Sequence, residues 1–125
     1  MRDEPIGSWE DFWPFYLGEH RVPLCRVLHV AGTTSGGSLA LLGLLTGEGG
    51  LFLLALMIGY GFSWVGHFLV ERNRPATFSH PLWSFRGDWK MVVLFWTRRL
   101  DGEVVRLFGD RHPTLAAVAA RRTKG

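Results

Sequence analysis

Residues 27–46 read VLHVAGTTSGGSLALLGLLT, and residues 51–70 read LFLLALMIGYGFSWVGHFLV. Neither run contains Asp, Glu, Lys or Arg, and each has the length of about 20 residues that a helix needs to cross a bilayer core. Only Gly47-Glu48-Gly49-Gly50 separates them, so the two runs predict a tight helical hairpin. The hairpin could instead be buried inside a soluble bundle, but the composition favours membrane insertion.

The remaining composition limits the class of protein. A chain of 125 residues is long enough for one domain, residues 1–125. The net charge of +3 would suit nucleic acid, but the apolar runs favour a membrane, and we expect membrane lipid and no nucleic acid as partner. Cys25 is the single cysteine, which excludes an internal disulfide and a zinc site built from cysteines. Histidine is therefore the main soft ligand available.

Amphipathic segments flank the hairpin. Ser8 is expected to cap a short helix that carries an aromatic stripe typical of an interfacial helix, and Pro23 favours a new helix start. Residues 82–100 predict an amphipathic helix on or partly in the membrane, and residues 113–125 form a basic tail that includes one more short helix. No cleavable signal is expected at the start. The fold class is thus all-α: an integral membrane helical bundle built on a transmembrane hairpin plus interfacial amphipathic helices.

Basic residues predict the orientation of the hairpin. The connecting loop has no Lys or Arg, three arginines precede the hairpin, and eleven basic residues lie from Arg72 onward. Since cytoplasmic flanks carry the excess of Lys and Arg, both flanks are expected in the cytoplasm. The protein is then a multi-pass protein of a bacterial inner membrane or the endoplasmic reticulum.

Four histidines are expected to meet at the cytoplasmic ends of the hairpin. His29 and His67 lie at nearly equal distances from its turn and so at the same depth. His20 and His80 lie just outside the two helices and can fold back to that level. Such a set suits zinc, copper or iron; alternatively, each histidine is hydrogen-bonded separately at the interface. His112, in the basic tail, is expected to be an ordinary surface residue.

Glu71 follows His67 by one helical turn, on the same face. Its carboxylate can accept a hydrogen bond from an imidazole N–H and so fix the tautomer of a ligand, or bind metal itself.

Other enzyme classes lack support: there are too few histidines for a membrane di-iron desaturase, and the chain has no G-x-S-x-G, Walker or Rossmann pattern.

These motifs resemble a family of small multi-pass membrane proteins that includes the fungal endoplasmic-reticulum 2-hydroxy-fatty-acid dioxygenase. The resemblance covers about residues 12–91, and Cys25 stands where the family pattern has Asn. It rests on four motifs: Phe15-Tyr16-Leu17-x-Glu19-His20, Arg26-x-Leu28-His29-x-x-Gly32-Thr33, Trp64-x-Gly66-His67-Phe68-x-x-Glu71-x-Asn73-x-Pro75-Ala76-Thr77-Phe78, and His80-Pro81-x-x-Ser84-x-x-x-Asp88.

The resemblance implies a nonhaem Fe(II) dioxygenase that shortens a 2-hydroxy fatty acid by one carbon with O2, with His20, His29, His67 and His80 as Fe(2+) ligands. Arg26, or else Arg72 or Arg74, is expected to hold the substrate carboxylate, and Arg26 and Glu71 are the predicted catalytic residues. The rival interpretation is a non-enzymatic membrane protein that a histidine or zinc cluster only braces.

Overall fold

Two long antiparallel helices form the predicted hairpin in the computed structural model, which describes residues 6–75 and 78–124. Helix α2 spans Pro23–Thr46, and α3 spans Gly49–Trp64 and continues as a π-helix, η1, over Val65–Glu71. Gly47 ends α2 with a left-handed φ of 74°, a conformation that glycine adopts at no steric cost. Pro23–Thr46 and Gly49–Glu71 are both long and apolar enough to cross a membrane.

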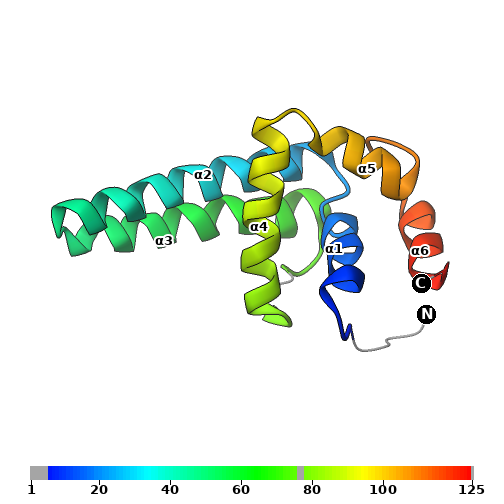
Figure 1. Cartoon of the computed structure of the whole chain (residues 1–125), viewed down its shortest axis with the longest axis horizontal. Coiled ribbons are helices and arrows are strands. Elements are labelled where there is room, and N and C mark those ends of the chain that lie inside the picture. The colour runs from blue at the N-terminus through cyan, green and yellow to red at the C-terminus, as the bar shows by residue number, and fades with distance from the viewer. Residues whose placement is uncertain (1–5, 76–77, 125) are drawn as a thin grey trace.

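The other helices gather at one end of the hairpin, and the half that carries its turn extends past them (Figure 1). Helix α4 crosses the hairpin steeply, and α1 lies beside it. The described residues contain no strand, so the all-helical fold class is confirmed. These outer helices are α1 (Trp9–Gly18), α4 (Pro81–Trp96), α5 (Leu100–Phe108) and α6 (Leu115–Lys124).

Local sequence signals set most of the helix ends. The Ser8 side chain accepts a hydrogen bond from the backbone N–H of Asp11, as a cap residue does, and Pro23 begins α2. The hairpin ends at Glu71 and not near Arg74, because Arg72 adopts a left-handed φ of 58°. Thr97 and the two residues after it separate α4 from α5, so the helix expected over residues 82–100 ends at Trp96.

The aromatic stripe of α1 packs inward. Phe12, Trp13 and Tyr16 are buried in the core together with Met91 and Val104. The sequence favoured a membrane–water interface for this stripe, because Trp and Tyr are common there. The stripe is buried because α4 and α5 cover it. No pattern in the sequence predicts that these helices pack against α1.

Candidate metal centre

Three histidines from three elements meet at the covered end of the hairpin. His20 follows α1, His29 lies in the first half of α2, and His67 lies in η1. All three are buried. Their ring centroids are 4.8 Å apart for His20 and His29, 4.4 Å for His20 and His67, and 5.9 Å for His29 and His67. The predicted convergence of these three histidines is therefore present in the structure.

The π-helix positions His67. A π-helix closes i→i+5 hydrogen bonds, so each turn contains more residues than an α-turn and the side chains are re-aimed; such bulges are frequent at functional sites. Beyond Glu71 the chain folds back, and the backbone N–H of Asn73 donates to the carbonyl of His67 at 2.9 Å. This return brings the Asn73 side chain beside the His67 ring.

Asn73 fixes the tautomer of His67. Its Nδ2 donates to the Glu19 backbone carbonyl at 2.9 Å and to Glu19 Oε2 at 2.7 Å, both of which can only accept. The Asn73 Oδ1 must then accept from His67 Nδ1, 2.8 Å away. His67 Nδ1 therefore carries the proton, and His67 Nε2 has a free lone pair.

The same reasoning fixes His20. Its Nδ1 lies 2.7 Å from the backbone carbonyl oxygen of Tyr16, and a carbonyl only accepts. His20 Nδ1 is therefore the donor, and His20 Nε2 has the lone pair. Burial, reinforced by the nearby His67 and His29, holds the pKa of His20 well below its usual range, so the ring is a neutral potential ligand.

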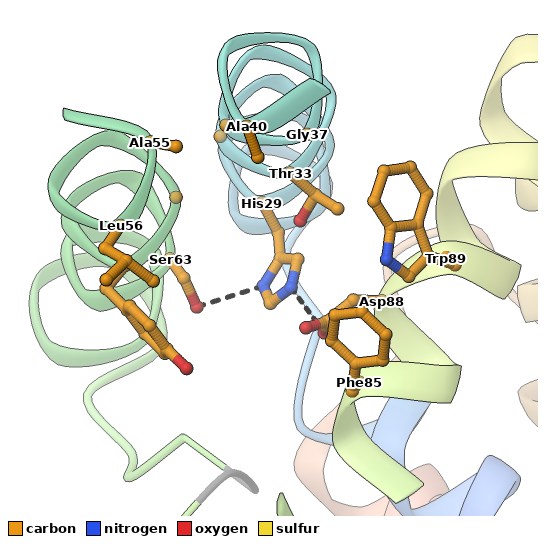
Figure 2. A pocket seen from close by; sticks show the side chains of 14 residues that line it. His29, Thr33, Gly37, Ala40, Ala55, Leu56, Ser63, Phe85, Asp88 and Trp89 are labelled. Carbon is orange, nitrogen blue, oxygen red and sulfur yellow. Dashed lines mark hydrogen bonds and ion pairs between the residues drawn. The ribbon is translucent and has the colours of Figure 1, made fainter. Parts of the chain in front are cut away.

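His29 points its Nε2 at Asp88 and its Nδ1 at His20 and Ser63. Nε2 lies 2.7 Å from Asp88 Oδ1, which also accepts a hydrogen bond from the Tyr16 hydroxyl. Ser63 Oγ lies 3.1 Å from His29 Nδ1, and Figure 2 shows the ring between Ser63 and Asp88. The carboxylate makes Nε2 the proton-bearing nitrogen, so the lone pair is on Nδ1.

Two of these lone pairs face each other. His20 Nε2 and His29 Nδ1 are 3.2 Å apart, and the hydrogen bonds that His20 Nδ1 and His29 Nε2 donate leave neither of the two facing nitrogens with a proton. The Ser63 hydroxyl, 3.1 Å from His29 Nδ1, can donate to that nitrogen when no metal is bound, whereas a cation between the two rings would accept both lone pairs. The separation is that of two nitrogens bound to one transition-metal ion at about 2.0–2.1 Å each, so this donor set fits a metal of the zinc, copper or iron type.

Cys25 is a candidate metal ligand that the sequence analysis did not name, because it considered only a zinc site built from several cysteines. One ligand atom from each of His20, Cys25 and His67 lies within 4.8 Å of the others, and all three residues are buried. His29 is not in this mutually close group, and joins it through its contact with His20. This buried group could bind a metal; a lone cysteine in the sequence gives no signal of such a position.

His80 lies apart from the other three rings in its contacts. Its ring packs against Phe12, Phe15 and Trp83, at centroid distances of 5.3, 6.3 and 5.8 Å, and its Nδ1 lies 2.9 Å from Ser79 Oγ. Its role as a fourth metal ligand stays a prediction. His112 is exposed, as expected, and contacts Arg21 through its Nε2.

Glu71 and Arg26 are held by groups other than histidines. Glu71 accepts a hydrogen bond from the backbone N–H of Val22, and its other oxygen lies 3.9 Å from Arg21 Nε. Glu71 was expected to accept a hydrogen bond from an imidazole, but the acceptor for His67 Nδ1 is instead Asn73 Oδ1. The catalytic role of Glu71 stays a prediction, but its contacts tie the end of η1 to the start of α2.

Arg26 is buried, and its guanidinium donates to three backbone carbonyls. Nη1 donates to His20 at 2.7 Å and to Arg21 at 3.0 Å, and Nη2 donates to Arg111 at 2.7 Å. These bonds fix the His20 backbone and connect it to the loop after α5. A role in holding the substrate carboxylate stays a prediction.

The geometry agrees with a comparison against known protein families. Residues 6–100 match the family model described as 2-hydroxy-palmitic acid dioxygenase Mpo1-like. No curated protein and no solved structure matches the chain. The match includes all the helices that supply the histidines, together with Asn73 and Asp88; residues 76 and 77 of the quoted motif lie outside the described residues.

Proposed function

Since the chain belongs to the Mpo1-like family, we propose that it is a nonhaem Fe(II)-dependent dioxygenase that shortens a 2-hydroxy fatty acid by one carbon. The observation that carries the proposal is the convergence of imidazole lone pairs from His20, His29 and His67 in a buried site. The family name supports the substrate class, and the donor set supports a metal site at this position.

The reaction balances without a further reductant. R–CH(OH)–COOH and O2 give R–COOH, CO2 and H2O; the C1–C2 bond breaks, the substrate loses four electrons, and both oxygen atoms of O2 are reduced. Bound Fe(II) would supply the activation of O2 and a binding point for the hydroxyl and carboxylate of the substrate. His20, His29 and His67 would hold the iron, and Cys25 lies close enough to join them.

The surrounding residues hold these ligands in their metal-binding tautomers. Asp88 accepts a hydrogen bond from the proton-bearing Nε2 of His29, and the Asn73 side-chain oxygen accepts one from Nδ1 of His67. Burial and Asp88 raise the pKa of Tyr16 well above its usual value, so its hydroxyl remains a donor to Asp88 throughout the neutral range. Hydrogen bonds that orient metal ligands in this way typically contribute 10- to 100-fold to metal affinity or activity.

The proposed location is an integral membrane position with the metal site near the cytoplasmic face. The two apolar helices supply the spans. The Lys and Arg residues lie on both flanks of the hairpin and are absent from its turn, which favours a cytoplasmic position for the end that carries the histidines.

The test is anaerobic loading of the purified protein with Fe(II), followed by 2-hydroxypalmitate and O2. We expect the acid shorter by one carbon and an equal amount of CO2. His67→Ala should abolish both metal binding and product, whereas the exposed matched control His112→Ala should retain both. Absence of product from the iron-loaded wild type, above a metal-free control, would refute the proposal.

A structural zinc site is the second candidate, because Cys25 lies with His20 and His67 and zinc commonly binds mixed sulfur and nitrogen ligands. In that case the protein is not an enzyme and the metal braces the helices. Metal analysis separates the two: iron that a chelator removes without unfolding supports the enzyme, whereas tightly held zinc whose removal unfolds the protein supports the brace.

A further inference from the structure

A cavity of about 310 Å³ runs along the hairpin from the histidine cluster. This volume is at the lower end of the range of about 300–1,000 Å³ that is usual for small-molecule sites. One end is polar and is formed by His29, Ser63 and Asp88; the other end is apolar and is formed by Ala40 and Ala55. Figure 2 shows α2 at its centre, with α3 on one side and α4 on the other.

Small residues of α2 form the floor of this cavity: Gly32, Gly36, Gly37 and Ala40. Gly37 has a further reason to lack a side chain, because a Cβ there would lie 2.5 Å from the Trp89 ring. The floor is therefore a smooth apolar surface over two turns of helix, and Trp89 of α4 covers part of it.

The walls are apolar and partly exposed. Leu56 and Tyr60 of α3 are 58% and 45% exposed, and Phe85 and Trp89 of α4 are 65% and 38% exposed. In a bilayer these side chains would face lipid, so an acyl chain can reach the cavity sideways without crossing water. Apart from the hydroxyls of Thr33 and Tyr60 and the indole N–H of Trp89, the walls offer few hydrogen-bonding groups, so a polar ligand would lose most of its hydration along them.

The length of the cavity selects the size of the ligand. His29 and Ala40 are eleven residues apart on α2, which at about 1.5 Å per residue is roughly 16 Å. The hydrocarbon core of a bilayer is about 30 Å thick, so one leaflet, and one long lipid chain within it, is about 15 Å deep. The cavity therefore has nearly the length of one lipid chain.

We propose that this cavity binds the hydrocarbon chain of a long-chain 2-hydroxy acid, with its head at the end where His29 and Ser63 lie and its methyl end at Ala40 and Ala55. Ala40 then limits the chain length. The inference rests on the proposed function for the identity of the head group. The tail site itself follows from the apolar walls, the length and the single polar end.

Narrowing the far end tests the chain-length role. Ala40→Phe should lower turnover of 2-hydroxypalmitate relative to 2-hydroxylaurate at least tenfold, because each methylene excluded from an apolar site costs roughly a fourfold factor. Leu41→Phe, at the neighbouring position that is 56% exposed, should keep the wild-type ratio. Leu56→Trp narrows the cavity from α3 and should act like Ala40→Phe, with Met57→Trp as its outward control. An unchanged ratio in both narrowing variants would overturn the inference.

A second readout does not depend on turnover. A 2-hydroxypalmitate analogue with a photoreactive diazirine near its methyl end is irradiated with the protein in phospholipid nanodiscs. We expect labelling near Ala40 and Ala55 that excess 2-hydroxypalmitate suppresses and that Ala40→Phe reduces at least tenfold. If no 2-hydroxy acid is turned over but this labelling occurs, the proposed reaction fails and the tail site stands. If excess 2-hydroxypalmitate does not suppress the labelling, the cavity holds ordinary membrane lipid and the proposed tail site is refuted.

Discussion

Asn73 orients a predicted metal ligand without contacting the metal itself. Asn73 is hydrogen-bonded both to His67 Nδ1 and to the backbone and side chain of Glu19. It therefore connects two residues, Glu19 and His67, that lie far apart in the sequence. Asn73→Ala leaves His67 free to rotate and to change tautomer. We expect metal affinity to fall roughly 10- to 100-fold, with the helical content unchanged by circular dichroism.

The matched control for Asn73 is Arg74→Ala, an exposed position in the same segment. Metal titration followed by elemental analysis gives the affinity of each variant. An affinity of Asn73→Ala equal to that of the Arg74→Ala control would show that the hydrogen bond to His67 does not position the ligand.

Glu71 gives a different expectation, because its carboxylate accepts from the backbone of Val22 and lies near Arg21. Glu71→Ala leaves the Val22 N–H without its partner, which should cost about 1–3 kcal/mol of unfolding free energy. Glu71→Gln keeps an acceptor and should restore most of this stability. Iron per chain should equal that of the wild type in both variants. Loss of iron from Glu71→Gln as complete as from His67→Ala would instead make Glu71 a ligand.

The closeness of His29 and His67 was predictable from the sequence because depth along a helical hairpin follows from counting residues from its turn, whereas the same reasoning did not bring His80 to them. This count brings His29 and His67 to one level, as observed. The roles of Cys25 and Asn73 were not predictable in the same way. Their positions depend on the π-helix and on the chain reversal after Glu71, and neither a lone cysteine nor an asparagine in a loop indicates such geometry.

At the scale of helices, α1 and α5 are joined by a hydrogen bond from Trp13 Nε1 to Glu103 Oε2 of 3.2 Å. The side-chain hydrogen bond from Arg106, helped by that from Trp13, holds the pKa of Glu103 below its usual value. A carboxylate with a lowered pKa stabilises the folded state above its unfolded pKa of about 4.3, and this stabilisation is lost as the pH falls through the lowered pKa.

Glu103→Gln should therefore destabilise the protein at pH 6 and make little difference well below pH 4. Thermal unfolding of wild type and variant in one detergent, across this pH range, measures the difference. Glu10→Gln, at an exposed position on α1, is the control and should give a constant, small difference. A difference between Glu103→Gln and wild type that does not shrink on acidification would contradict the assigned ion pair.

Helix boundaries were predictable where a residue type forces them, as at Pro23 and Gly47. They were less predictable where backbone geometry alone decides. Arg72 and Arg98 adopt positive φ values of 58° and 61°, which non-glycine residues rarely adopt. Arg72 ends the hairpin, and Arg98 lies between α4 and α5. Neither the arginine side chain nor the local hydrophobic periodicity predicts a positive φ at these positions.

For the whole molecule, the hairpin turn lies at one end and α5 and α6 lie at the other, with α4 between them (Figure 1). Leu44 and Leu45, near the turn, are 69% and 75% exposed, an arrangement that favours lipid around this half of the hairpin. If the hairpin spans a bilayer with both flanks in the cytoplasm, the turn must face the other side. Topology is then measurable with two reporter thiols, since Cys25 is fully buried.

Glu48→Cys places a thiol in the turn, and Asp110→Cys places one beyond α5; both positions are exposed. In bacterial spheroplasts, a membrane-impermeant maleimide should label Glu48→Cys at once and label Asp110→Cys only after permeabilisation. The absence of Lys and Arg from the turn and their abundance on the flanks give this direction. The reverse pattern would place the metal site outside the cytoplasm. Labelling of both thiols only after permeabilisation would mean that the hairpin does not span the membrane, because its turn and its flanks would then lie on the same side.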